Sequence, residues 1–189
     1  MNDIMSIPSC AIVIGGRGLV GTALVLELSN SSNWELHYSQ RNVVADGRSF
    51  KLDLSTFRDR AIESVTARIV RGRTTVFLVA ACTGVVRCEA EPETWAVNFD
   101  APVQLALATA AVGGQPIFIS SDAVSRAPHT AYAKQKAMTE LAVLGCGGIV
   151  IRPSRITQDG APAFASYLRQ VAEDVEQTGV RSRIFKYET

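Results

Sequence analysis

The sequence predicts a doubly wound α/β fold, in which one parallel sheet lies between two layers of helices. Three observations support this prediction. Short runs rich in β-branched residues alternate with longer helical stretches along the chain. The strand-like runs are apolar throughout, which is typical of a parallel sheet that helices cover on both faces. A glycine-rich stretch directly follows the first run, where such a fold makes its first strand-to-helix turn.

The individual elements are predicted from the same patterns. The first expected strand is the run Ala-Ile-Val-Ile at residues 11–14, and a helix is expected at residues 19–29. Further strands are expected at residues 35–38, 49–52, 75–79, 116–119 and 148–152. Further helices are expected at residues 57–70, 92–112, 132–144 and 164–178. Residues 181–189 are expected to hold a last strand. Right-handed crossovers would join these strands into one three-layer domain that spans residues 1–189.

The composition excludes several classes of function. The 19 basic and 18 acidic side chains give a formal net charge of +1, so the chain lacks the positive charge typical of proteins that bind nucleic acid or anionic membranes. The apolar run at residues 10–14 ends in glycines before it could span a membrane. The cysteines form no CxxC pair and have no histidine cluster nearby, which argues against a metal site and a disulfide framework: Cys10, Cys82, Cys88 and Cys146. We therefore expect a cytoplasmic protein whose partner is a small molecule.

The glycine-rich stretch is the first candidate site. The segment Gly15-Gly-Arg-Gly-Leu-Val-Gly21 satisfies both the GxGxxG and the GxxGxxG spacing. Glycine at these positions permits a tight turn, close approach of the backbone to a pyrophosphate, and close packing of the helix whose N-terminus receives the phosphates. A purely structural turn is the alternative, but the strand before it and the helix after it favour a dinucleotide site. The expected contacts are Gly15, Gly16, Arg17, Gly18, Leu19, Val20 and Gly21.

The end of the second strand indicates which dinucleotide is preferred. Sites for NAD usually carry an acidic residue there, whereas this chain has Ser39 and Arg41. These two side chains can bind the 2′-phosphate that a carboxylate would repel, so we expect NADP, with NAD as the alternative. A solvated loop charge is the other interpretation of Arg41. Asp53, at the end of the third strand, fits either a hydrogen bond from the adenine amino group or a helix cap.

A second candidate site combines serine, tyrosine and lysine. Ser121 lies just after an expected strand, and Tyr132 and Lys136 lie four positions apart at the start of an expected helix. That spacing places Tyr132 and Lys136 on one helical face. A nearby ammonium lowers the pKa of a phenol, so Tyr132 could exchange a proton with a carbonyl or alcohol. Such a pair is common on ordinary helices, and the glycine loop is what favours the catalytic interpretation.

Several motifs occur in a fixed order along the chain. They are the glycine loop, Leu52-Asp-Leu54, Ala80-Ala81, Ile119-Ser-Ser-Asp122, YxxxK from Tyr132, and Ile151-Arg-Pro153. In this order, residues 11–155 resemble the extended short-chain dehydrogenases/reductases. The stretch at residues 80–98 is similar to the dTDP-4-dehydrorhamnose reductase and NAD-dependent epimerase branch. The resemblance implies a Rossmann fold with a bound dinucleotide.

The resemblance also implies roles for single residues. Tyr132 corresponds to the catalytic acid and base, Lys136 to its partner that also contacts the nicotinamide ribose, and Ser121 to the catalytic serine. Further cofactor contacts are implied for Asp53, Leu54, Ala80, Ala81 and Asn98.

Two functions stay open at this point. The first is an NAD(P)-dependent oxidoreductase, reductase-like or epimerase-like, which acts on a carbonyl or hydroxyl of a small substrate such as a nucleotide-sugar. The second is a non-catalytic NAD(P)-binding regulatory subunit or a truncated remnant, because the C-terminal region that binds substrate in the resembled family is largely absent from residues 1–189. The resemblance further allows a homodimer through the helices at residues 92–112 and 132–144, or a partner chain that completes the substrate lobe.

Overall fold

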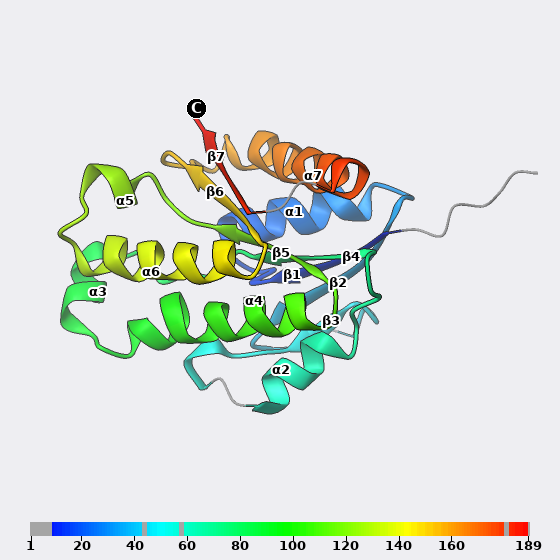
Figure 1. Cartoon of the computed structure of the whole chain (residues 1–189), viewed down its shortest axis with the longest axis horizontal. Coiled ribbons are helices and arrows are strands. Elements are labelled where there is room, and N and C mark those ends of the chain that lie inside the picture. The colour runs from blue at the N-terminus through cyan, green and yellow to red at the C-terminus, as the bar shows by residue number, and fades with distance from the viewer. Residues whose placement is uncertain (1–8, 43–44, 57–58, 180–181, 189) are drawn as a thin grey trace, which may run out of the picture.

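A computed structural model of the chain describes residues 9–42, 45–56, 59–179 and 182–188 (Figure 1). One sheet of parallel strands runs through its middle, in the order β3-β2-β1-β4-β5-β6-β7. The strands are β1 (Ser9–Ile14), β2 (Trp34–Gln40), β3 (Ser49–Lys51), β4 (Thr74–Leu78), β5 (Gln115–Ile119), β6 (Ile149–Pro153) and β7 (Arg183–Tyr187). This order confirms the predicted doubly wound parallel sheet.

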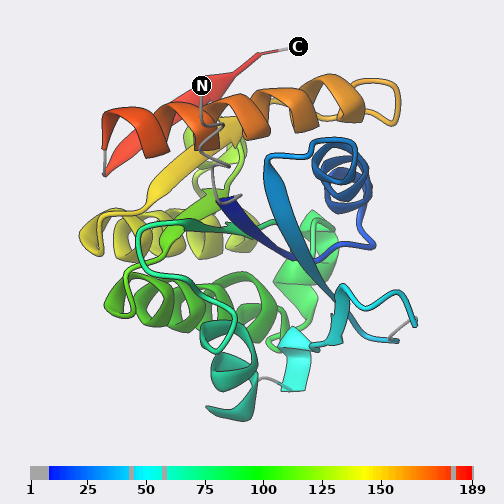
Figure 2. The same cartoon turned by 90° about the vertical axis from the view of Figure 1, so that its right-hand side faces the viewer.

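Helices cover both faces of the sheet (Figures 1 and 2). They are α1 (Leu19–Ser29), α2 (Asp59–Thr66), α3 (Val85–Ala90), α4 (Ala101–Ala111), α5 (Ala123–Arg126), α6 (Ala131–Gly145) and α7 (Ala161–Thr178). Helices α1 and α7 lie side by side on one face, and α2, α4 and α6 lie on the other. None of the described helices is long and apolar enough to cross a membrane.

Strand β1 shows why the strand runs are apolar throughout. Ala11 and Val13 pack into the core beneath α1 and α7, whereas Ile12 and Ile14 pack into the core beneath α4 and α6. All four side chains are almost completely buried. Both faces of the strand therefore need apolar residues, and no polar alternation is left.

The position of β1 also sets the place of the site. It pairs with β2 on one side and with β4 on the other, so the order of strands reverses between β1 and β4. In an open α/β sheet, the loops that leave the carboxyl ends of two such strands diverge and leave a crevice for a ligand. The glycine loop follows β1, and Ala80 follows β4 shortly after its end.

The structure corrects the helix that was predicted at residues 92–112. Residues 94–95 are helical, a π-helical turn (Ala96–Asp100) follows them, and the regular helix α4 begins at Ala101. Pro102 has no N–H group to donate one turn back, to the carbonyl of Asn98. That carbonyl instead accepts a hydrogen bond from the Thr139 hydroxyl of α6, at 2.8 Å. Proline thus leaves one carbonyl of the π-helical turn free of its helical partner, and Thr139 ties that turn to α6.

Other elements differ less from the prediction. Helix α2 ends at Thr66 rather than at residue 70, and residues 57–58 of the predicted helix lie outside the described residues. Helices α3 and α5 were not predicted, because six and four residues are too few to show a helical period. Strand β7 confirms the last predicted strand.

Candidate functional site

A pocket of about 1150 Å³ opens at the carboxyl ends of the strands, where their order reverses. Most of the residues expected to bind cofactor or to act in catalysis line it. These are Gly15, Arg17, Gly18, Leu19, Val20, Ser39, Arg41, Asp53, Leu54, Ala80, Ala81, Ser121, Tyr132 and Lys136. Gly16, Gly21 and Asn98 were expected there and do not line it. Residues that lie up to 121 positions apart in the sequence thus meet in one pocket.

The fold does not require glycine equally at every position of the loop. Gly15 has a φ of 102°, and a Cβ there would lie 2.8 Å from the Ala80 backbone nitrogen. A Cβ on Gly21 would overlap the carbonyl oxygen of Gly15, so α1 can pack against the loop only with glycine there. A Cβ on Gly18 would meet only that same oxygen, at 3.6 Å, which is an ordinary contact. The fold therefore requires Gly15 and Gly21, whereas at Gly18 it leaves open space at the pocket.

The N-terminus of α1 lies at this open space. Its N-cap is Gly18, which has no side chain to satisfy the first N–H groups, and its first turn carries no acidic residue. The unsatisfied N–H groups and the positive end of the helix dipole favour an anion there. Together with the room beside Gly18, this end of the pocket fits the pyrophosphate of a dinucleotide.

Ser39 has a more structural position than expected. Its side chain is buried, and its hydroxyl accepts a hydrogen bond from the Gly15 N–H at 2.9 Å. Its carbonyl accepts a second one from the Gly16 N–H at 3.0 Å. Ser39 thus fastens the glycine loop to the end of β2, while the exposed Arg41 beside it lines the pocket.

Asp53 shows the geometry of a cap. Its carboxylate accepts hydrogen bonds from both the backbone N–H and the hydroxyl of Ser55, at 3.0 and 2.7 Å. These bonds are the main reason why the pKa of Asp53 is lowered. Asp53 also lines the pocket, so capping does not remove it from reach of a ligand.

The three residues expected in catalysis lie together. Helix α6 begins after Thr130, whose hydroxyl accepts a hydrogen bond from a first-turn N–H. One turn of this helix separates Tyr132 and Lys136, and both side chains are buried. The ammonium of Lys136 donates to the carbonyl of Ile119 at 2.9 Å and lies 5.9 Å from the centre of the Tyr132 ring. Ser121 follows β5 and hydrogen-bonds Tyr132.

Burial decides how the two titratable groups behave. It raises the pKa of Tyr132 to about 12, and the hydrogen bond with Ser121 only partly opposes this shift. It lowers the pKa of Lys136 to about 7, although the nearby charge of Glu140 acts in the other direction. Lys136 has therefore lost its proton long before Tyr132 would ionise. The pKa of Tyr132 is therefore raised rather than lowered as expected, and Lys136 is not among the groups that shift it.

Asn98 supports the pocket wall from behind. Its side-chain oxygen accepts a hydrogen bond from the N–H of Cys82 at 2.8 Å, and its amide nitrogen donates to the carbonyl of Cys82 at 3.0 Å. The same nitrogen donates to Gln135 of α6 at 2.7 Å. Asn98 is fully buried and holds the loop after β4 in place.

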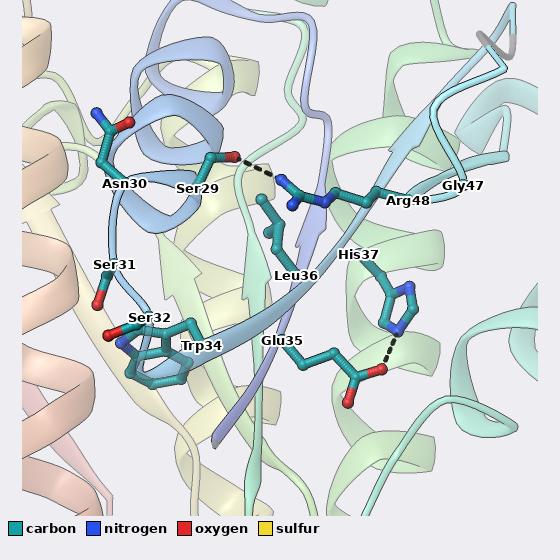
Figure 3. A pocket seen from close by; sticks show the side chains of 10 residues that line it. All are labelled: Ser29, Asn30, Ser31, Ser32, Trp34, Glu35, Leu36, His37, Gly47 and Arg48. Carbon is teal, nitrogen blue, oxygen red and sulfur yellow. Dashed lines mark hydrogen bonds and ion pairs between the residues drawn. The ribbon is translucent and has the colours of Figure 1, made fainter. Parts of the chain in front are cut away.

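A second hollow, of about 570 Å³, lies at the other end of β2 (Figure 3). Its lining is mostly polar, and Figure 3 shows Arg48 donating to the Ser29 hydroxyl and His37 facing Glu35. It contains none of the residues expected in a site. We therefore take the larger pocket as the candidate functional site.

Most of the chain matches one known protein family. The model of the family described as RmlD substrate binding domain matches residues 10–182, which is most of the chain. This chain belongs to the RmlD substrate binding domain family. A comparison with curated proteins gave no match.

Solved structures share the fold of this chain. The dTDP-4-dehydrorhamnose reductase of Bacillus anthracis, in complex with NADP, superposes with a TM-score of 0.65 at 21% identity, over 79% of this chain and 54% of that one. The dTDP-4-dehydrorhamnose reductase of Yersinia enterocolitica gives 0.64 at 24% identity, over 77% and 52%. This chain thus spans about half the length of these two reductases. At such identities the likeness establishes the fold.

A shorter protein matches over its whole length. It is an oxidoreductase of the short-chain dehydrogenase/reductase family from Brucella ovis, in complex with a partially ordered NAD. The TM-score is 0.74 at 18% identity, and the match covers 96% of this chain and 100% of that one. The Rossmann fold expected for this RmlD-family chain is therefore confirmed.

Some site residues of this RmlD-family chain were not found from its sequence. Glu140 is buried one turn beyond Lys136, and its carboxylate accepts hydrogen bonds from Ser120 at 2.5 Å and from Arg152 at 2.8 and 2.5 Å. The four-residue spacing that joins Tyr132 to Lys136 continues to Glu140 and could have indicated it. Gln40 also lines the pocket, and its amide atoms are buried without a partner among the described residues. The sequence could have indicated Gln40, because it lies between Ser39 and Arg41, which were both expected to bind the cofactor.

Proposed function

We propose that this chain is an NAD(P)-dependent oxidoreductase that reduces a carbonyl, or oxidises a hydroxyl, of a small substrate. The observation that carries the proposal is that the glycine loop and the group of Ser121, Tyr132 and Lys136 line the same pocket. The RmlD family match and the likeness to NADP-bound and NAD-bound oxidoreductases support it. A nucleotide-sugar is the substrate class that we infer from the two reductases. The single sheet with one core on each face supports a single dinucleotide-binding domain.

The site chemistry favours proton donation. A bound NAD(P)H supplies the hydride. Because its pKa is raised to about 12, Tyr132 keeps its phenolic proton near neutral pH and can give it to a carbonyl oxygen that gains negative charge. The Ser121 hydroxyl, which hydrogen-bonds Tyr132, can orient the same oxygen. Lys136, held by the carbonyl of Ile119, can bind ribose hydroxyls beside Tyr132.

Gly18→Val tests whether the dinucleotide binds at the glycine loop. We expect the variant to fold like the parent, because the fold leaves space at Gly18, and to lose roughly tenfold or more in dinucleotide affinity because the valine occupies the phosphate position. Calorimetric titration with NADPH and NADH measures the affinity, and thermal unfolding checks the fold. Gly145→Val is the matched control, since no atom lies near its Cβ position and it does not line the pocket. Unchanged affinity in Gly18→Val would refute the assigned position.

We further propose that NADP is preferred over NAD, because Arg41 is exposed at the pocket where a 2′-phosphate would lie. Arg41→Ala is expected to remove a charge-assisted contact of about 1.5–3 kcal/mol, or roughly 10- to 150-fold in affinity, from NADPH alone. Titrations with both cofactors measure this preference. Arg48→Ala removes another exposed charge, at the second hollow, and is the control. Equal weakening of NADH and NADPH would contradict the assignment.

A homodimer, or a partner chain that completes the substrate lobe, stays a proposal. Leu107 of α4 and Met138 and Leu141 of α6 have exposed side chains on the two helices that the resemblance indicated. Such apolar exposure supports a partner surface there.

A further inference from the structure

Two thiols lie next to each other in the wall of the pocket. Cys82 is partly exposed in the loop after β4 and lines the pocket, whereas Cys88 of α3 is buried. The thiol of Cys88 donates a hydrogen bond to the carbonyl of Cys82 at 3.4 Å. A hydrogen bond between the two thiols is among the causes that raise the pKa of Cys88, after burial. Nothing in the proposed chemistry uses either sulfur atom.

Asn98 keeps these two residues in place. It binds both backbone polar groups of Cys82, and its amide nitrogen lies 3.6 Å from the sulfur of Cys88. Asn98 is itself fastened to Gln135 of α6 at 2.7 Å. One buried side chain thus holds the backbone of Cys82 beside the thiol of Cys88.

We propose that Cys82 and Cys88 form a reversible disulfide when a peroxide enters the pocket. The sulfur of Cys82 attacks one peroxide oxygen, the O–O bond breaks, and Cys82 becomes a sulfenic acid as one water leaves. The sulfur of Cys88 then attacks the sulfur of Cys82, the S–O bond breaks, and the proton of Cys88 leaves with that oxygen as a second water. Two thiols are oxidised to one disulfide while hydrogen peroxide is reduced to two waters.

The two thiols differ in their roles. Cys82 reacts first, because it is the one that a solute in the pocket can reach. Cys88 reacts second and needs no access from solvent, since it attacks its neighbour from inside the wall. Cys82 and Cys88 do not have the CxxC spacing of a redox motif. The pair is therefore visible in the fold and not in the sequence.

Oxidation changes the pocket. A disulfide draws two sulfur atoms to about 2 Å and removes the thiol proton that Cys88 gives to the carbonyl of Cys82. The loop that carries Cys82 also presents Ala80, Ala81 and Thr83 to the pocket. We therefore expect the disulfide to weaken dinucleotide binding by roughly 5- to 150-fold, the usual range for coupling between two sites. This consequence rests on the proposed function, whereas formation of the disulfide does not.

The sequence offers a direct test of the disulfide. Trypsin cleaves after Arg73, Arg87 and Arg126, so Cys82 and Cys88 fall into separate peptides, residues 74–87 and 88–126. The full chain is treated with hydrogen peroxide, its remaining thiols are alkylated, and it is digested without reductant. Mass spectrometry should find these two peptides joined, lighter by two hydrogens than their sum, and separated again by dithiothreitol. Cys82→Ser and Cys88→Ser should give no joined pair. Cys146→Ser, which removes another partly exposed thiol, should give it in full.

Two results would overturn the proposal. If the peptides stay separate although Cys82 of the untreated chain is readily alkylated, the disulfide does not form. If it forms but NADPH affinity is the same before and after oxidation, the effect on the pocket is refuted. A chain that binds neither NADPH nor NADH in its reduced form contradicts the proposed function instead, and the peptide result still decides the disulfide.

Discussion

Tyr132→Phe is expected to lower turnover by roughly 10²- to 10⁴-fold while dinucleotide affinity stays at the parental value. The substitution keeps the ring that packs near Lys136 and removes only the hydroxyl that hydrogen-bonds Ser121. The carbonyl oxygen then gains charge with no phenolic proton to neutralise it. Steady-state rates with NADPH and nucleotide-sugar ketones measure turnover, and calorimetry measures affinity. Tyr167→Phe, at a partly buried tyrosine of α7 away from the pocket, is the matched control.

The pH profile of the parent adds a second readout. Burial lowers the pKa of Lys136 to about 7, so its ammonium is present below pH 7 and is lost as the pH rises through that value. We expect kcat/KM to fall over this range, and no further change from Tyr132 until far more alkaline pH. Parental turnover in Tyr132→Phe would rule out the assigned proton donor. A parent that binds NADPH yet turns over no carbonyl substrate would favour the regulatory subunit.

Glu140→Leu is expected to reduce the free energy of unfolding by about 3–5 kcal/mol, because it leaves the Arg152 guanidinium largely buried without its carboxylate. The side chains of Glu140 and Arg152 are only 4% and 20% exposed, and the shortest contact between them is 2.5 Å. Urea unfolding of parent and variant measures the loss.

A second ion pair provides the control for Glu140. Glu91 and Arg87 also lie 2.5 Å apart, but their side chains are 39% and 61% exposed. Glu91→Leu should therefore cost no more than about 1 kcal/mol. Equal losses in the two variants would show that burial does not set the strength of the Glu140 pair. Replacing both Glu140 and Arg152 by apolar residues should restore much of the stability, because no charge is then left unpaired.

The parts of the site that the sequence predicted are those with a local signature. The glycine loop is contiguous and stands between a strand and a helix, and the spacing of Tyr132 and Lys136 is one helical turn. The sheet was predictable for a related reason, since burial on both faces makes each strand, such as β1, apolar throughout.

The parts that the sequence could not predict depend on contacts between distant segments. Asn98 lies behind the pocket because its amide pairs with the backbone of Cys82 and with Gln135, and no spacing in the sequence indicates those partners. Ser39 was expected to bind the 2′-phosphate of the cofactor, whereas its hydroxyl accepts a hydrogen bond from the Gly15 N–H of the glycine loop. The raised pKa of Tyr132 was missed because it follows from burial, which a helical spacing does not reveal.

The double packing of β1 has a consequence for how this protein can be assayed. Its side chains belong to both cores, so neither layer of helices can detach while the other stays native. The described chain should therefore melt as one cooperative unit. A ligand held by the loop after β1 would stabilise that whole unit by mass action, whichever face it touches. A single thermal shift curve can thus serve as a screen for cofactors and substrates, including compounds that are bound but not turned over.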